Sequence, residues 1–388
     1  MSFDHRGETM KTYYLDHAAT TPVDSQVLEV MWPYMHDHYG NASSIYRIGV
    51  ENRKAINQAR KTIADTLGAL PEEIYFCSGG TEASNWAIKG YADTHPDLTE
   101  IITSTIEHHA TLHACESLER KGHVLRKIDV DKDGFLDLKA LEKAISKQTL
   151  MVTVIWGNNE IGTVQDIEAV SRICQKHDVA LHVDAVQAVG QLPIDLTAVD
   201  IDLMTISAHK FYGPKGMGLL YIKKGTDVAP LIHGGRHEMN LRAGTECVAG
   251  IVGMAEALRR AVERQQAYHE HLSRLSTTFL AMARETFDDV RLNGPLPGRQ
   301  RLPGLLSLSF RHIEGLQLAF ALDRRGVFVS TGSACSADSL VPSHVLEAIN
   351  VPELENLGTI RISFGHDNKT DDLPIILGHL QDALLELR

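Results

Sequence analysis

Short apolar runs that alternate with helical patterns dominate the first 210 residues of the chain. Each run ends in a polar or glycine-rich turn: Ile74 to Cys77, Ile101 to Ser104, Leu150 to Trp156, Val179 to Val183 and Leu203 to Ile206. Strands that are apolar throughout and alternate with helices are typical of a parallel sheet covered on both faces. The sequence therefore predicts an α/β fold with a mostly parallel sheet, in which ligands bind at the carboxyl ends of the strands.

The pattern changes after about residue 260. A long charged helix is predicted from Glu256 to Ala283, followed by short strands at Gly304 to Phe310 and Thr359 to Phe364 and a final helix from Leu373. This mixture is typical of a second, smaller α+β unit, and 388 residues suffice for more than one domain. We predict a large domain over residues 16–262 and a small domain built from residues 1–15 and 263–388.

The charge distribution excludes several classes of partner. The net charge is −12, from 38 basic and 50 acidic residues, and no basic stripe is present to contact a nucleic acid backbone. The segment from Met1 to Met10 has the pattern of neither a signal peptide nor a transit peptide. The longest clean apolar run falls far short of the ~20 residues of a membrane helix. We expect a cytoplasmic protein that binds neither nucleic acid nor membrane.

The 5 cysteines do not form a disulfide pattern, because their number is odd and no CxxC pair occurs. Cys335 differs from the others, since it lies among Ser, Gly and Ala residues in a loop predicted at about residues 328–342. Such a loop is expected to be mobile and to carry an accessible thiolate, which is a competent nucleophile. The others are interpreted as packing residues: Cys77, Cys115, Cys174 and Cys247.

Two metal-binding patterns fail on inspection. The opening of a calcium loop is matched by Asp129, Asp131, Asp133 and Gly134, but the position that needs a bidentate Glu is Ala140. We therefore interpret this segment as a tight turn. His109 and His113 lie one helical turn apart, yet no third ligand is apparent, and we predict no metal site.

The polar residues at the predicted strand ends suit pyridoxal phosphate. Lys210 follows an apolar strand, where burial would free its amine for Schiff-base chemistry, and Asp184 follows the preceding strand, where it could pair with a pyridine nitrogen. The turn from Ser78 to Thr81 offers backbone N–H groups to a phosphate. Each feature alone has a commoner explanation, namely a surface lysine or an ordinary turn. The same constellation includes Ser207 and His209 as further donors and His108 as a stacking ring.

Several longer segments resemble one known family. They are Tyr14 to Pro22, Ser78 to Glu82, Asn158 to Gly162, His182 to Gln187, Ser207 to Lys210 and Ser333 to Ser336. These segments are similar to those of the cysteine desulfurases in the class V aminotransferase group, specifically the NifS/IscS-like branch. The resemblance extends to Ser363 and covers nearly the whole chain. It implies an aspartate-aminotransferase-type fold, a pyridoxal 5'-phosphate cofactor and a homodimer.

The resemblance also implies a role for each site residue. Lys210 would bind the cofactor covalently, Asp184 would pair with its pyridine nitrogen, and His108 would stack on its ring and transfer a proton. Arg361 would bind the substrate carboxylate. The remaining residues would contact the phosphate, the phenolic oxygen or the substrate: Gly80, Thr81, Ser207, His209, Asn159, Gln187 and, from the second subunit, Thr245.

The implied activity is the removal of sulfur from L-cysteine, which gives L-alanine and a persulfide on Cys335. An acceptor protein would then take the sulfur for iron–sulfur cluster assembly or for tRNA or other thiolation. The chain ends at Leu385 to Arg388, short of the tail with which housekeeping members dock their scaffold, so the acceptor stays open. Alternatives are a class V aminotransferase or a selenocysteine lyase, from which Cys335 distinguishes the proposed activity. A further alternative is a non-catalytic sulfur-pathway interaction protein, against which stands the intact set Lys210, Asp184, His108, Cys335 and Arg361.

Overall fold

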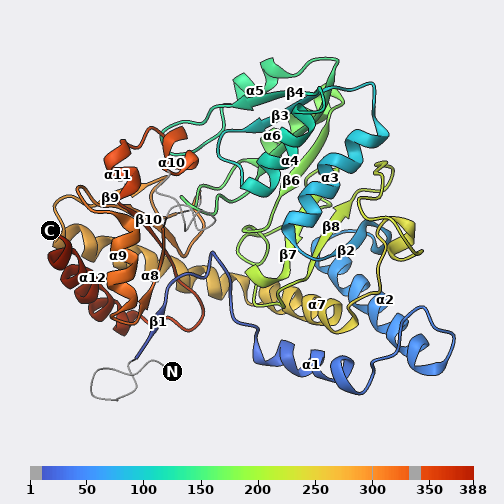
Figure 1. Ribbon diagram of the computed structural model, residues 1–388, viewed down its shortest axis with the longest axis horizontal. Helices are drawn as coiled ribbons and strands as arrows, with labels where there is room; N and C mark the ends of the chain where they lie inside the picture. Colours follow the sequence, from blue (N-terminus) through green and yellow to red (C-terminus); the bar gives the residue numbers. More distant parts are fainter. Residues whose placement is uncertain (1–10, 299, 332–341) are drawn as a thin grey trace.

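The computed structural model describes residues 11–298, 300–331 and 342–388. A large sheet and its helices form one end of the molecule, and a smaller sheet with its own helices forms the other (Figure 1). The helices are α1 Ser25–His36, α2 Arg47–Leu67, α3 Gly80–Thr94, α4 His109–Glu119, α5 Leu138–Ala144, α6 Ile167–His177, α7 Val248–Glu263, α8 Gln265–Thr286, α9 Gly315–Asp323, α10 His344–Ala348, α11 Glu353–Leu357 and α12 Leu373–Leu387.

The large sheet has the strand order β2-β8-β7-β6-β5-β3-β4. Its strands are β2 Ile74–Cys77, β3 Glu100–Ser104, β4 Val124–Ile128, β5 Thr149–Ile155, β6 Ala180–Asp184, β7 Leu203–Ser207 and β8 Gly218–Ile222. Only β8 is reversed, because it pairs antiparallel with both β2 and β7 while the other pairs are parallel. The predicted mostly parallel sheet is therefore confirmed, and six carboxyl ends meet at one edge.

Both faces of this sheet are covered, as the continuous apolar strands require. Helices α3 and α4 cover one face, where Trp86 and Leu118 pack against strand residues such as Leu220. On the other face, α2, α6 and α7 pack their apolar sides onto residues such as Val183. Successive side chains of a strand point to opposite faces, so each strand contributes to both cores. The edge of the sheet is left for ligands.

A second sheet lies at the other end of the molecule (Figure 1). It has the order β12-β13-β10-β9, and its strands are antiparallel: β9 Arg291–Asn293, β10 Leu305–Ser309, β12 Ser330–Thr331 and β13 Thr359–Ser363. Its core includes Phe279 from α8, Leu318 from α9 and Leu380 from α12. An N-terminal segment also joins this core, because β1 Tyr13–Tyr14 pairs with β11 Val327–Phe328.

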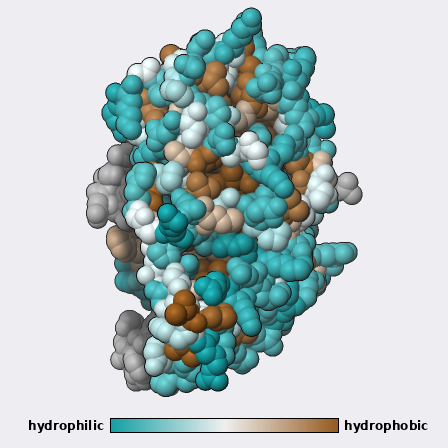
Figure 2. All heavy atoms as spheres, turned by 90° about the vertical axis from the view of Figure 1, so that its right-hand side faces the viewer, coloured by the Kyte–Doolittle hydropathy of each residue, from teal (hydrophilic) through white to brown (hydrophobic). Residues whose placement is uncertain are grey.

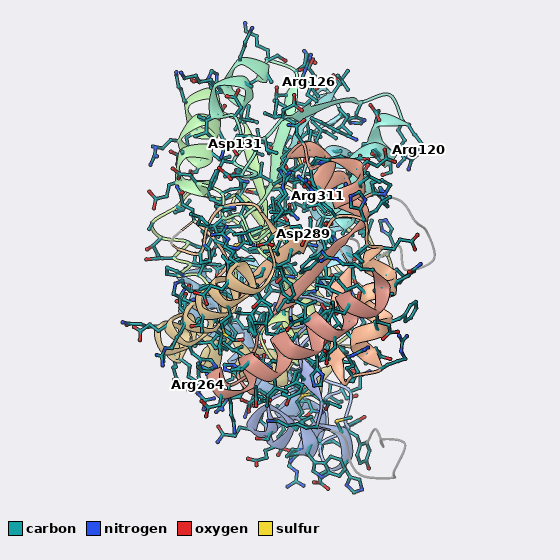
Figure 3. The ribbon with its side chains drawn as sticks, turned by 90° about the vertical axis from the view of Figure 1, so that its left-hand side faces the viewer. Arg120, Arg126, Asp131, Arg264, Asp289 and Arg311 are labelled. Atoms are coloured by element: carbon teal, nitrogen blue, oxygen red, sulfur yellow. The ribbon has the colours of Figure 1, made fainter. Side chains whose placement is uncertain are left out.

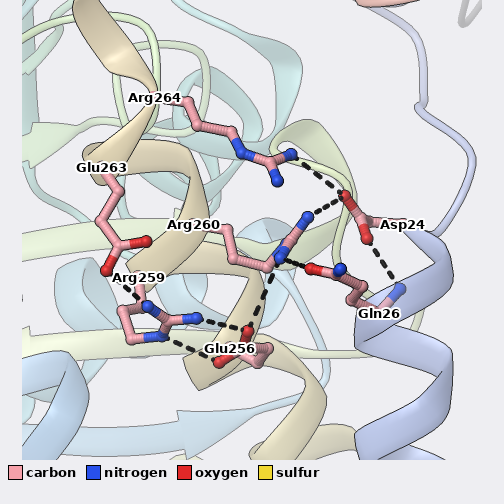
Figure 4. A network of polar contacts seen from close by, with 7 residues as sticks. All are labelled: Asp24, Gln26, Glu256, Arg259, Arg260, Glu263 and Arg264. Atoms are coloured by element: carbon pink, nitrogen blue, oxygen red, sulfur yellow. Dashed lines mark hydrogen bonds and ion pairs between the residues drawn. The ribbon is translucent and has the colours of Figure 1, made fainter.

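The prediction of a single long helix from Glu256 to Ala283 is wrong. The structure has two helices, α7 and α8, and Arg264 between them departs from helical geometry with φ −100° and ψ 1°. A network of ion pairs surrounds this break (Figure 4). Asp24, at the start of α1, lies 3.1 Å from Arg260 Nη2 and 3.8 Å from Arg264 Nη1. These contacts tie α1 to the junction, a long-range effect that helical periodicity cannot reveal.

The predicted turn near Asp131 is confirmed. Asp131 Oδ1 accepts hydrogen bonds from the N–H groups of Asp133 and Phe135, both at 2.9 Å, and Val130 bridges to Leu136. Figure 3 labels Asp131 within this surface segment. Among residues 11–298, 300–331 and 342–388, no group of three or more His, Cys, Asp or Glu side chains is arranged to hold a metal ion. No helix in those ranges is long and apolar enough to cross a membrane.

Candidate active site

A cavity of about 260 Å³ opens at the carboxyl edge of the large sheet, where side chains from both sheets meet. Loops and turns after β2, β3, β5, β6 and β7 form most of its wall, and β13 contributes the opposite side. The structure brings together all but two of the predicted site residues here: Gly80, Thr81, His108, Asn159, Asp184, Gln187, Ser207, His209, Lys210 and Arg361.

Lys210 and Asp184 define the floor of this cavity. Lys210 lies in a short 3₁₀ turn after β7, and its Nζ donates to the carbonyls of Ala18 and Ala19 at 2.6 and 2.7 Å. Asp184 ends β6, is buried, and its Oδ1 accepts from Val186 N at 3.0 Å. Burial raises the pKa of Asp184 to about 6, and the charge of Lys210 partly opposes this. A buried carboxylate in such a place suits a cationic ring nitrogen.

Two histidines of the cavity are held neutral. Burial, helped by the nearby charge of Lys210, lowers the pKa of His108 to about 4. His108 caps α4, and its Nδ1 accepts from Ala110 N at 3.1 Å. Burial likewise lowers the pKa of His209 to about 4, and its Nδ1 lies 3.0 Å from Thr20 Oγ1. A neutral imidazole can accept a proton or place a flat ring against an aromatic ligand.

A cradle for an anion lies at the start of α3. Gly79 precedes this helix with φ +153°, in a region that favours glycine, and the first helical residues, Gly80 and Thr81, line the cavity. A Cβ on Gly80 would lie 2.9 Å from Val186 Cγ2, so a larger residue would fill the space. Thr81 and Ser207 add hydroxyl groups. The helix N-terminus and these hydroxyls fit a phosphate group.

Arg361 faces the cavity from β13. Its guanidinium is buried, Nη1 donates to Asn159 O at 2.9 Å, and Nη2 pairs with Asp16 Oδ1 at 2.8 Å. The Nε atom has no hydrogen-bond partner among the residues that the structure describes. A buried donor that lacks a partner is costly, so an anionic group in the cavity would satisfy it. The pairing of Asp16 with Arg361 was not predicted, because the two residues are far apart in the chain and no local pattern links them.

Two predicted residues are not placed in this cavity. Thr245 is exposed and outside the cavity of its own chain, so its contact across a subunit boundary stays a prediction. Cys335 lies outside the described residues. Conversely, several lining residues were not predicted, among them Glu160 and His344. His344 is joined to the wall by Nε2, 3.0 Å from Glu107 O, a contact without a local sequence signal.

The remaining cysteines differ from one another. Cys77, Cys115 and Cys174 are buried as predicted, and burial raises the pKa of all three thiols. The interpretation of Cys247 as a packing residue is wrong, because this side chain is exposed just before α7 begins. The three buried thiols are poor nucleophiles, since only the thiolate reacts readily.

Comparisons with known proteins agree with this geometry. The Aminotransferase class-V family matches residues 13–376. A cysteine desulfurase IscS from Dictyoglomus turgidum is 46% identical over 376 residues, 97% of this chain and 95% of that protein. A solved NifS-like protein has 37% identity and a TM-score of 0.92, covering 97% of this chain and 100% of its own. SspA in complex with cysteine has 37% identity and a TM-score of 0.80, covering 91% and 99% respectively. The chain therefore belongs to the class-V aminotransferase family and, within it, to the IscS-like cysteine desulfurases, which depend on pyridoxal phosphate.

Proposed function

We propose that this chain is a cysteine desulfurase that converts L-cysteine to L-alanine and loads the sulfur onto Cys335. The observation that carries this proposal is one cavity lined by Lys210, Asp184 and Arg361, in which the buried Nε of Arg361 has no hydrogen-bond partner among the described residues. The relatives named cysteine desulfurase and the neighbour solved with cysteine support the choice of substrate. When bound, pyridoxal phosphate withdraws electrons from the Cα atom of an attached amino acid.

The residues of the chain divide the work around that group. Lys210 would hold the cofactor through its amine, and Asp184 would stabilise a proton on the pyridine nitrogen. Arg361 binds the substrate carboxylate, a task for which a planar guanidinium is well suited. The neutral imidazole of His108 or the released amine of Lys210 accepts the α-proton. The phosphate would be held by the cradle at the start of α3, which includes Gly80, Thr81 and Ser207, together with His209.

Cys335 is the proposed sulfur acceptor within the chain. Its thiolate attacks the substrate sulfur, so an S–S bond forms while the substrate C–S bond breaks. The released carbon skeleton takes up protons and leaves as alanine, and Cys335 carries a persulfide. Thiol plus cysteine thus gives persulfide plus alanine, and no external oxidant or reductant is needed. This thiol chemistry suits a reducing compartment such as the cytoplasm.

Replacing Cys335 by alanine should abolish sulfur transfer while the yellow cofactor remains bound. The physical reason is that the nucleophile is lost and the cavity residues that hold the cofactor are untouched. Isotope-labelled cysteine and mass spectrometry would locate the added sulfur in the parent protein and the variant. A Cys247→Ala variant is the control, because Cys247 is an exposed cysteine that lies outside the cavity. Undiminished sulfur release by Cys335→Ala would reject the proposed route.

The sulfur is passed on to an acceptor protein for iron–sulfur cluster assembly or for tRNA or other thiolation. The name IscS among the relatives supports a role in cluster assembly, and the structural neighbour SspA was solved in complex with cysteine. The labelled persulfide identifies the pathway directly. After loading with labelled cysteine, the enzyme is mixed with purified candidate acceptors, and the protein that gains the label names the pathway.

The enzyme acts as a homodimer, in which Thr245 contacts the phosphate in the partner subunit. Figure 2 shows apolar patches on the face formed by the right-hand side of Figure 1. Large exposed apolar side chains are frequent in α1 and the segment after it: Leu28, Trp32, Met35, Tyr39, Ile45 and Tyr46. Such exposure is unusual for a monomer and typical of an interface.

Sedimentation equilibrium of the parent protein should give twice the chain mass. A Thr245→Val variant should remain dimeric and bind the cofactor at least several-fold more weakly, because a hydroxyl donor to the phosphate is lost. A Thr226→Val variant is the matched control, since Thr226 lies far from the cavity, beyond β8. A monomeric holoenzyme with full activity would contradict the dimer.

A further inference from the structure

Glu160 is a buried carboxylate in the cavity wall to which the mechanism above gives no role. Its Oε2 accepts a hydrogen bond of 2.5 Å from Ser343 Oγ, and both side chains are withdrawn from solvent. Glu160 follows β5 of the large sheet, whereas Ser343 belongs to the other end of the chain. A short hydrogen bond to a carboxylate, formed away from water, is among the stronger polar contacts in proteins.

The backbone around Glu160 is held by hydrogen bonds from a neighbouring side chain. Asn158 Oδ1 accepts from the N–H groups of Glu160 and Ile161, both at 2.9 Å, and Asn158 Nδ2 donates to Ile106 O. The neighbouring Asn159 carbonyl receives Nη1 of Arg361. The carboxylate of Glu160 is therefore mounted on the same short segment that orients the proposed substrate-binding arginine.

Ser343 is likewise held in place by several hydrogen bonds. Ser343 caps α10, because its Oγ accepts from Val345 N and Leu346 N at 3.2 and 3.3 Å. Asn356 holds its backbone, accepting from Ser343 N at 2.9 Å and donating to Ser343 O at 3.1 Å. In the sequence, Ser343 directly follows the stretch of chain that bears Cys335. The contact with Glu160 thus joins the residue that follows this stretch, Ser343, to the cavity wall.

We propose that Glu160 is a positioning residue for sulfur transfer, which fastens Ser343 and the start of α10 to the cavity wall beside Arg361. The proposal rests on the function proposed above. Two features of the contact support it: the partners come from segments far apart in the chain, and the backbone of each is independently held by an asparagine side chain. A purely local role in helix capping would not require a carboxylate in the cavity.

The test separates substrate binding from sulfur transfer in the holoenzyme. Glu160→Ala and Ser343→Ala should bind L-cysteine at rates within about 2-fold of the parent. The change in cofactor absorbance monitors this binding. Persulfide formation, followed by rapid quench and mass spectrometry, should be slowed at least about 10-fold in each variant, as expected for a lost charge-assisted hydrogen bond. The double variant should be no slower than the slower single variant, because both changes remove one contact.

Conservative variants keep the test decisive if an alanine variant fails to fold. Glu160→Gln keeps an acceptor for Ser343 and should recover most of the rate lost in Glu160→Ala. Ser343→Asp still caps α10 but places a second carboxylate against Glu160, and it should be slow until combined with Glu160→Gln. Glu347→Ala, an exposed change on α10, is the matched control and should match the parent.

The outcomes distinguish this inference from the proposed function. If the parent protein forms no persulfide, the proposed function fails. If the parent forms it and both alanine variants do so at the parental rate, the positioning role is rejected. Multiplicative slowing in the double variant, or no rescue of Ser343→Asp by Glu160→Gln, would also reject it, because the two residues would then act separately.

Discussion

A Lys210→Ala variant should lose on the order of 10⁴-fold or more of the desulfurase activity, the largest effect expected of any single change in the cavity. The amine is needed twice, first to attach the cofactor and then as a candidate acceptor of the α-proton. Without the covalent bond, the cofactor should be removable by dialysis. Steady-state alanine formation and the absorbance of the dialysed protein measure the two losses separately.

Two further lysine variants show whether position or chemistry is responsible. Lys215 is exposed and also donates to a backbone carbonyl, that of Thr21 at 3.2 Å, so Lys215→Ala should stay within about 2-fold of the parent. Lys210→Arg keeps the charge and can still donate to the carbonyls of Ala18 and Ala19, but it should be inactive because a guanidinium does not form the bond. Covalently retained cofactor in Lys210→Ala would show that another lysine attaches it.

The floor of the cavity was predictable because it depends on local patterns. Asp184 and Ser207 end strands that are mostly apolar, and parallel strands bring their carboxyl ends to a common edge. The sequence motif therefore carries most of the geometry. The reversed strand β8 does not disturb this edge, since its neighbours β2 and β7 still run in the same direction.

The opposite wall was predictable only in part, because it depends on contacts between distant segments. The resemblance identified Arg361, but its ion pair with Asp16 spans nearly the whole chain. The same holds for Glu160, whose partner Ser343 is far away in the sequence and caps α10. The break at Arg264 likewise reflects contacts with α1 rather than any helix-breaking residue. Periodicity reports which face of an element is buried, but not what meets it.

An Asp184→Asn variant should lose about 10²–10³-fold in kcat/KM, the second largest effect expected of a single change in the cavity. The carboxylate is proposed to hold a proton on the pyridine nitrogen, and a neutral amide holds it far less well. The amide oxygen can still accept from Val186 N, so the local backbone should be unchanged. The absorbance spectrum of the bound cofactor and the rate of alanine formation are the measurements. An Asp195→Asn variant is the control, because Asp195 is an exposed loop carboxylate.

The same substitution should stabilise the protein when no cofactor is bound. Burial raises the pKa of Asp184 from 3.8 to about 6, so the folded apoprotein favours the protonated carboxyl. Stability from this group is present below pH ~4, is lost as the pH rises to about 6, and stays lost above that. At ~1.4 kcal/mol per pKa unit, the loss approaches ~3 kcal/mol.

Urea unfolding of the apoprotein should therefore show Asp184→Asn more stable than the parent at pH 8, with the difference shrinking toward pH 4. Buried carboxyls whose pKa does not depend on Asp184, such as Glu160, are common to both proteins and cancel. The charge of Asp184 helps to raise the pKa of Glu107, so its removal also relieves Glu107 and adds to the difference with the same sign. If the variant is the less stable of the two at pH 8, Asp184 is not a carboxylate held ionised at a cost in stability, and its role as the partner of the ring nitrogen loses its physical basis.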